Sequence, residues 1–330
     1  MLKPIKPQAI LPTQGMLLAV CLLGVVGGAS AQEVSQPPKI QLLATKEILF
    51  EQSASTGLNY RIDASTNLLD WISLTTLRST GLIQHTDTRA PYLASRFYRA
   101  LPVSGSTILT GDHLATADGE IIFHPINHAS FVMSWNGKLI YNDPVGGSSP
   151  YQGLPRADLI LVSHSHGDHF DATTLNSVRG TNVVIIAPRP VYNSMTTALK
   201  NLTIVLNNGE ITNVMGLAVE AIPAYNGNHP KGDGNGYVVT VGGKRLYMSG
   251  DTGNIPEMRS LQNIDVAFVC VNVPFTMTVS EAAAAVRAFA PRVVYPYHFR
   301  NSGGSLSDLN ALKQQIGADL GVEVRSRKWY

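Results

Sequence analysis

Three histidines and one aspartate lie close together in the segment SHSHGDHF at residues 163–170. His164 and His166 are two apart on an extended segment, so their side chains point the same way and can share one metal ion. Asp168 and His169 follow a flexible glycine and can turn toward a second ion. Crowded imidazoles and carboxylates destabilise a fold unless a cation compensates, and they are usual ligands of zinc and related divalent ions. The segment therefore predicts a metal site.

Four side chains cannot complete two coordination shells, so further ligands are expected at the ends of later strands. Asp251 lies in a turn after an apolar run and could bridge two cations, with an ordinary helix cap as the alternative. His298 directly follows the apolar run 293–297. The remaining candidate imidazole is His229, in a loop rich in glycine and asparagine, where Asn226 competes for the same role.

Other polar residues are expected around the ligands or away from them. Asp143 follows a strand-like run and is predicted to support a ligating histidine from behind. His128 is predicted to line the pocket or orient a ligand, with plain packing as the alternative. His85, His113 and His124 lack such a context and are expected to be ordinary surface or core residues.

The candidate ligands require strands that end at one place. From residue 106 onward, apolar strand-like runs are interrupted by helical stretches, which predicts a layered α/β domain. Helices are predicted at 173–178, capped by Asp171, at 281–289, capped by Ser280, and at 306–316. The predicted strands occupy residues 121–123, 139–141, 158–162, 183–187, 217–222, 237–241, 245–248, 266–271 and 293–297.

Residues 40–103 have a different composition, with short strand-like runs, many Thr, Ser and aromatic residues, and turn signals between them. This predicts a small all-β domain that a linker at 102–106 joins to the α/β domain. Its stretches YRIDASTNLLDWISL and RFYRA resemble a β-module of secreted bacterial proteins, which implies an accessory role such as surface or glycan contact. Trp71 and Tyr98 are predicted core aromatics, with a sugar platform as the alternative.

The first 31 residues have the pattern of a secretory signal peptide. Lys3 and Lys6 precede the apolar run 16–29, and small residues lead to a cleavage position after Ala31. The alternative is a membrane anchor, but a membrane span requires roughly 20 apolar residues and this run is shorter. The protein is therefore expected to be exported, to the periplasm or beyond.

Removal of this peptide takes away two lysines and no acids, so the formal net charge of +2 becomes 2 − 2 = 0. A neutral chain does not attract a polyanion over a broad surface, which argues against nucleic acid and leaves a small molecule as the expected partner. Cys270 is then the one remaining cysteine, and its apolar run predicts a buried structural thiol. The oligomeric state stays open.

The region Ser106–Tyr330 resembles the metallo-β-lactamase superfamily at the motifs SHSHGDH, GDT and PYH. The stretches NHASFVM, IYNDPV, AYNGNHPKG and VEVRSRKWY resemble, within it, the branch of L-ascorbate-6-phosphate lactonase-like and related zinc-dependent hydrolases. The resemblance implies an αββα metallo-β-lactamase-type sandwich, here preceded by the small all-β domain, with the metals at one edge of the paired sheets.

The resemblance also implies a division of the ligands between two metals. Relatives differ in the loop of the third ligand of the first metal, so the choice between His229 and Asn226 stays open. The implied ligands are His164, His166 and His229 for the first metal, Asp168, His169 and His298 for the second, and Asp251 as the bridge.

Two divalent cations, expected to be Zn²⁺ with Mn²⁺ or Fe²⁺ as alternatives, would share a bridging hydroxide that attacks a carbonyl or phosphoryl centre. Asp168 would be both a ligand and the catalytic residue that orients this nucleophile and passes a proton to the leaving group. The first hypothesis is hydrolysis of an ester-like small molecule, a lactone by resemblance to the branch. The second is a phosphodiesterase for a lipid or nucleotide, which Lys231 or Arg300 near the metals would favour. The third is a non-catalytic binding protein with a vestigial metal site.

Overall fold

The computed structural model describes residues 38–104 and 109–330 of the chain. The predicted signal peptide at 1–31 lies outside the described residues. Contacts divide the chain into two compact units, with the boundary between Val103 and Ser104, and the short segment Thr75–Leu77 is grouped with the larger, second unit. Among the described residues, no helix has the length and apolar character that a membrane span requires.

The smaller unit consists of strands around an apolar core, as the composition of residues 40–103 predicts. Tyr98 is fully buried and its ring lies 6.0 Å from that of Phe50, so its predicted place in the core is confirmed. Trp71 is only half-buried and stacks under the guanidinium of Arg99, so it is not a core residue. The strands are β1 (Lys39–Leu42), β2 (Ile48–Ser53), β3 (Asn59–Ser65), β4 (Trp71–Arg78), β5 (Leu82–Asp87) and β6 (Phe97–Val103), with the 3-10 turn η1 (Ala90–Tyr92).

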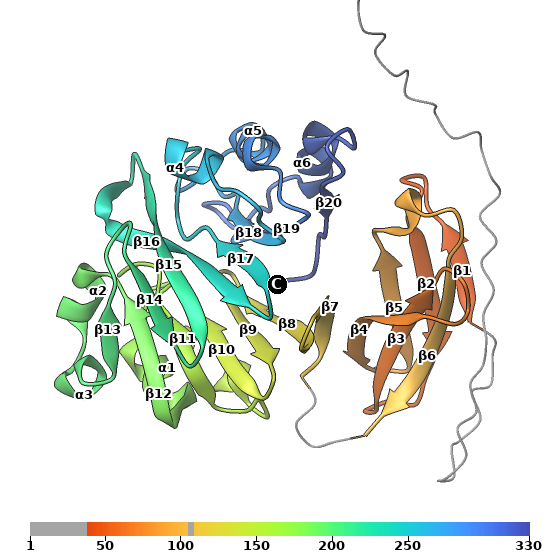
Figure 1. The fold of residues 1–330 in the computed structure, drawn as a ribbon, viewed down its shortest axis with the longest axis horizontal. Coiled ribbons are helices and arrows are strands. Elements are labelled where there is room, and N and C mark those ends of the chain that lie inside the picture. The colour runs from red at the N-terminus through yellow and green to blue at the C-terminus, as the bar shows by residue number, and fades with distance from the viewer. Residues whose placement is uncertain (1–37, 105–108) are drawn as a thin grey trace, which may run out of the picture. The chain divides into compact units, whose positions relative to one another are not determined.

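The larger unit contains two mixed sheets (Figure 1). In each, one half is antiparallel and the other half, which leads to most of the candidate ligands, is parallel. The first sheet has the order β13-β12-β11-β10-β9-β8-β7, with β7 (Gly111–Thr116), β8 (Gly119–Asn127), β9 (Ser130–Trp135), β10 (Lys138–Asn142), β11 (Ala157–Leu161), β12 (Arg179–Ala187) and β13 (Thr203–Val205). The second has the order β14 to β20, with β14 (Ile211–Val214), β15 (Leu217–Asn226), β16 (His229–Val241), β17 (Lys244–Met248), β18 (Val266–Cys270), β19 (Val293–Tyr297) and β20 (Glu323–Val324).

Strand β11 shows how the layers are held together. Leu159 and Leu161 join the apolar core between the sheets, while Ile160 and Val162 point to the opposite face and pack in a second apolar cluster with the nearby helices. Because both faces of the strand are buried, its sequence is a continuous apolar run rather than an alternating one. The covering helices complete the predicted αββα sandwich: α1 (Ala172–Val178), α2 (Arg189–Ser194), α3 (Thr197–Lys200), α4 (Pro256–Arg259), α5 (Val279–Phe289) and α6 (Leu309–Ile316), with the 3-10 turn η2 (Ser149–Tyr151).

Two predicted helix starts are wrong, and in both cases a stronger cap decides. Helix α5 is capped by Thr278, not Ser280, because Thr278 and Glu281 form a reciprocal pair of hydrogen bonds to the backbone. Helix α6 begins at Leu309 rather than at residue 306, because the Asp308 carboxylate accepts hydrogen bonds from two backbone amides of its first turn. Asp171 caps α1 as predicted.

Strands β7, β9, β13, β14 and β20 were not predicted, and of the predicted strands β16 extends furthest beyond its expected bounds. It begins at His229, eight residues before the predicted start at 237, and its first half pairs with β15 up to the contact of Asn226 with His229. Gly234 and Gly236 allow this, since an added Cβ would lie 3.3 Å from the His164 side chain and 2.9 Å from the Met248 carbonyl, respectively. The glycine-rich stretch is therefore a strand that passes close to its neighbours.

Candidate metal centre

Most candidate ligands follow the carboxyl ends of parallel strands, where open α/β sheets bind their ligands. The segment from His164 to His169 follows β11, Asp251 follows β17, and His298 directly follows β19. Asp143 follows β10, the parallel neighbour of β11. His229 arrives differently, at the first position of β16 after the hairpin from β15.

His164, His166 and His229 form the first group. Their ligand atoms all lie within 4.8 Å of one another. Nε2 of His229 is 3.2 Å from Nδ1 of His166 and 3.7 Å from Oδ2 of Asp251. A small cavity of about 40 Å³ opens among these four residues, enough for a cation and bound water.

The second group forms around His298. Its Nε2 is 3.0 Å from Nε2 of His169 and 3.4 Å from Oδ2 of Asp168. Oδ1 of Asp251 lies 3.3 Å from Nε2 of His169 and 3.5 Å from Nε2 of His298. The two Asp251 oxygens thus face different groups, because Oδ2 points to His229. Asp251 does not cap α4, whose N-cap is Ile255.

Asp143 decides which nitrogen carries the proton in two of the buried imidazoles. His169 donates from Nδ1 to Oδ2 of Asp143 at 2.8 Å. Ser163 donates its hydroxyl to the same carboxylate at 2.7 Å, so its oxygen is free to accept from Nδ1 of His164, 3.1 Å away. Both rings therefore present the lone pair of Nε2 to the centre, and Nε2 of His164 is buried without a hydrogen-bond partner.

Asn226 has the same effect on His229. Its amide nitrogen donates to the carbonyl of Phe275 at 3.0 Å, so its oxygen faces Nδ1 of His229, also at 3.0 Å. The ring then carries its proton on Nδ1 and turns the Nε2 lone pair toward His166 and Asp251. The structure thus groups His229 with the candidate ligands His164 and His166, and Asn226 lies behind it.

The electrostatics of the cluster favour a positive charge. Burial alone would raise the pKa of the Asp251 carboxyl, but the surrounding imidazoles of His298 and His169 outweigh it and hold the pKa well below its usual value. Burial would lower the pKa of His169, but the carboxylates of Asp251 and Asp143 raise it well above normal. Burial, reinforced by neighbouring imidazoles, lowers the pKa of His164 to about 2. Converging lone pairs and ionised carboxylates fit a divalent cation.

Three residues of the centre adopt the left-handed backbone conformation that side chains other than glycine rarely take. They are Asp143 at φ 41°, His128 at φ 58° and His298 at φ 47°. The backbone amide of His298 donates to the carbonyl of His128 at 3.1 Å, and the two rings lie 3.6 Å apart. Such strain, of order 1–3 kcal/mol each, is typical of functional sites whose surroundings hold it in place.

Comparison with known proteins agrees with this geometry. A profile described as the beta-lactamase superfamily domain matches residues 123–298, more than half of the chain. The chain belongs to the metallo-β-lactamase superfamily. The UPF0173 metal-dependent hydrolase of Pyrococcus abyssi is 30% identical over 212 residues, which cover 60% of this chain and 93% of that protein.

Solved structures resemble the chain as well. The crystal structure of a protein from Parabacteroides distasonis described as a metal-dependent hydrolase is 37% identical, with a TM-score of 0.60, and covers 67% of this chain and 99% of its own. The metallo hydrolase Igni18 of Ignicoccus hospitalis shares the fold at 24% identity and a TM-score of 0.56, covering 63% of this chain and 95% of its own. The chain is a metal-dependent hydrolase of the metallo-β-lactamase superfamily.

The other residues considered from the sequence lie either at the candidate metal centre or away from it. His128 contacts Asp168, with Nε2 to Oδ2 at 3.2 Å, and forms a candidate metal-binding group with Asp168 and His298. Lys231 forms an ion pair with Glu257. Cys270 is a buried free thiol, and burial raises its pKa to about 11, as expected of a structural cysteine. Among the described residues, no metal-ligand group includes His85, His113 or His124.

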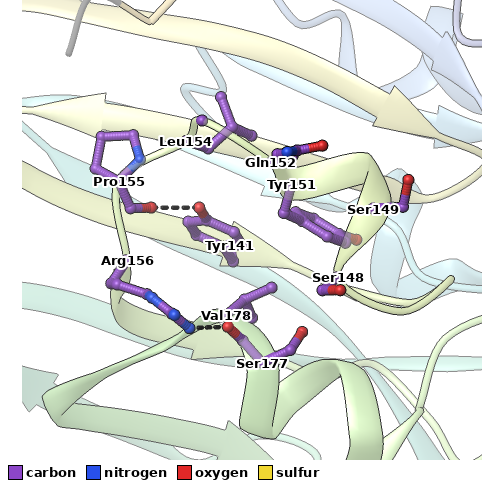
Figure 2. Close-up of a pocket in the computed structure, with 11 residues that line it drawn as sticks. Tyr141, Ser148, Ser149, Tyr151, Gln152, Leu154, Pro155, Arg156, Ser177 and Val178 are labelled. Atoms are coloured by element: carbon purple, nitrogen blue, oxygen red, sulfur yellow. Dashed lines mark hydrogen bonds between the residues drawn. The ribbon is translucent and has the colours of Figure 1, made fainter. Parts of the chain in front are cut away.

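A larger cavity of about 440 Å³ lies elsewhere in the fold, along the connection between β10 and β11 (Figure 2). Figure 2 shows Tyr141 donating its hydroxyl to the carbonyl of Pro155, and Arg156 bound to the carbonyl of Ser177. None of the metal-ligand candidates lines it. The larger cavity is therefore not the candidate site, because candidate ligands line the smaller cavity instead.

Two residues of the centre were not predicted. Ser163 links Asp143 to His164, and Tyr330 lies 2.9 Å through its hydroxyl from Nδ1 of His128. Ser163 is part of the main motif, and its position directly before His164 is the one signal that the sequence offers. Tyr330 is 202 residues away from His128, and although it ends the stretch VEVRSRKWY used for the resemblance, nothing in that stretch indicates a place beside the candidate ligands.

Proposed function

We propose that this metal-dependent hydrolase works with two divalent cations, expected to be Zn²⁺, on an ester-type bond of a small molecule such as a lactone. The observation that most directly supports this proposal is that the two carboxylate oxygens of Asp251 face two different groups of imidazoles. A purely structural zinc needs four closed ligands and no shared carboxylate. The exclusive use of imidazole and carboxylate ligands suits zinc, and also manganese or iron.

Cations held by these residues would lower the pKa of a bound water from about 15.7 toward about 7 and would so supply a nucleophile at neutral pH. Asp168 is the ligand carboxylate that is open to solvent, with 48% of its side chain exposed. Burial would raise its pKa, but His128 and His298 hold it well below its usual value, so the carboxylate is ionised. It can therefore accept a hydrogen bond from the attacking water and orient it toward the substrate.

The surrounding charges favour an ester over a phosphodiester. A phosphodiester carries a negative charge that cationic side chains stabilise. Of the two cations considered, Lys231 is paired with Glu257 at 2.5 Å. Arg300 stacks on the ring of Tyr330 at 4.0 Å and is the one left to meet an anion. A single available guanidinium offers little stabilisation to the charge of a phosphodiester. The charges therefore fit a neutral carbonyl substrate better than a phosphodiester.

The proposal is tested by metal content and by turnover. Metal analysis of wild type is expected to find about two equivalents of a transition metal, and Asp251→Ala should lose at least one. A panel of lactones, phosphodiesters and β-lactams is then compared between wild type and Asp168→Ala. Faster turnover of lactones by wild type than by the variant supports the proposal, whereas turnover confined to phosphodiesters would replace it with the second hypothesis.

A further inference from the structure

The carboxylate of Asp168 is exposed, and it lies on a loop just after Gly167, yet a ligand must be held in a fixed orientation. The nearest atoms of the ligand set, Nε2 of His298 and Nε2 of His169, lie 3.4 and 3.8 Å from its Oδ2. The hydrogen bond from outside the predicted ligand set comes from Nε2 of His128 at 3.2 Å. This bond holds Asp168 only if His128 carries its proton on Nε2.

Tyr330 can decide where that proton sits. The backbone amide of Arg300 donates to the Tyr330 hydroxyl oxygen at 3.2 Å, so this oxygen already acts as an acceptor. Its single proton is then available for Nδ1 of His128, which lies 2.9 Å away. A histidine that accepts at Nδ1 is protonated at Nε2 when neutral, and Nε2 faces Asp168.

The segment that carries Tyr330 is firmly attached. Arg325 donates to the hydroxyl of Tyr295 at 2.8 Å, and Arg327 donates to the carboxylate of Asp112 at 2.7 Å. Trp329 is buried and its ring packs edge-on against those of three core aromatics. The guanidinium of Arg300 covers the Tyr330 ring at 4.0 Å. These contacts fix the position of the hydroxyl, as a group that orients another residue requires.

We propose that Tyr330 is a positioning residue: it fixes His128 as an Nε2 donor, and His128 in turn holds Asp168 as a ligand of the second cation. The proposal rests on the dinuclear centre proposed above. Outer partners of metal ligands typically change metal affinity by about 10- to 100-fold. We therefore expect Tyr330→Phe to weaken binding of the second cation by about tenfold and to leave the first cation unchanged.

The experiment is a titration of the metal-free full chain with Zn²⁺ against a competing chelator, repeated with Co²⁺ to follow the absorption of the second site. His128→Ala is expected to weaken the second cation by up to about 100-fold, and His128→Gln, which keeps an amide donor, to recover most of that loss. Tyr192→Phe is the matched control. It removes a hydroxyl from a tyrosine on α2 that contacts Arg189 and Lys200 rather than the centre, and its titration should equal that of wild type.

A double-mutant cycle with Asp168→Ala decides whether the effect passes through Asp168. If it does, Tyr330→Phe has no further effect on metal affinity once Asp168 is removed. Equal losses with and without Asp168, or no loss in the single variant, would overturn the proposal. A wild type that binds one equivalent would refute the dinuclear centre instead, and the same cycle on that equivalent still judges the role of Tyr330.

Discussion

Replacing Asp143 by asparagine tests whether the layer behind the ligands controls metal binding. The carboxylate is fully buried and accepts three hydrogen bonds, from the Ser163 amide at 2.6 Å, the Ser163 hydroxyl at 2.7 Å and Nδ1 of His169 at 2.8 Å. Asparagine has the same shape but one acceptor oxygen and an NH₂ group that only donates. Asp143→Asn therefore cannot satisfy all three donors in either orientation of the amide.

The two orientations fail in different ways. If the amide oxygen of the variant faces His169, its NH₂ group faces the Ser163 amide. Two donors then lie opposite each other where the wild-type donor and acceptor are 2.6 Å apart. With its oxygen toward the Ser163 amide, the NH₂ group faces Nδ1 of His169, and the imidazole proton moves to Nε2, where the metal would bind. A lost hydrogen bond to a buried charged group is worth about 1.5–3 kcal/mol. This corresponds to a roughly 10- to 100-fold loss of affinity for the second cation.

The assay is the competition titration with Zn²⁺, combined with thermal unfolding in the presence and absence of a chelator. Because metal stabilises the folded state by mass action, the gain in Tm from added Zn²⁺ should shrink in Asp143→Asn. Asp158→Asn is the matched control, since Asp158 lies on β11 and accepts from the Leu139 amide at 2.9 Å, away from the ligands. If folded Asp143→Asn binds both cations as tightly as wild type, the tautomer argument is wrong.

Two further predictions concern residues outside the centre. Burial would raise the pKa of Asp87, but the ion pair with the buried Arg96 outweighs it and lowers the pKa. The folded carboxyl therefore stays ionised below about pH 3.9, where the same carboxyl in the unfolded chain takes up a proton. The free energy of unfolding should thus fall as the pH falls below that value. Urea unfolding at pH 7 should show that Asp87→Asn lowers the free energy of unfolding by about 3–5 kcal/mol and makes it depend less on acid pH. The control Asp70→Asn, at an exposed position, should leave the free energy of unfolding unchanged. Equal effects of the two substitutions would contradict the pairing of Asp87 with Arg96. Cys270 is buried and its pKa is raised to about 11, so it should not react with a thiol reagent at pH 7.5 until the chain is unfolded. The reaction of this thiol is measured as the difference between wild type and Cys270→Ser. Rapid reaction in the folded protein would disprove its burial.

The sequence predicted strands well where burial on both faces left long apolar runs. Strand β19 was placed at its observed bounds, and β11 within one residue. It missed β7, β9, β13, β14 and β20, and it failed at the first half of β16, because His229 to Gly236 contains polar and glycine residues that resemble a loop. There the spacing is set by close approach to His164 and Met248, which tertiary contacts determine and local composition does not reveal.

The candidate ligands followed from one dense motif and from the ends of apolar strands, and Asp143 was expected behind a histidine for the same reason. What the sequence could not supply is the direction of each hydrogen bond, because that depends on partners far along the chain. Asp143 reaches His169 across 26 residues, and Tyr330 reaches His128 across 202.

That outer layer determines more than the geometry of the site. Imidazole binds a cation through the nitrogen that lacks a proton, and the hydrogen bond made by the other ring nitrogen decides which nitrogen that is. The protein must therefore fix each tautomer in advance, and it does so with different groups: a carboxylate for His169, a hydroxyl for His164 and an amide for His229. Two sequences with the same ligands but different partners behind them should thus differ in metal affinity, even though the ligand motif alone would classify them together.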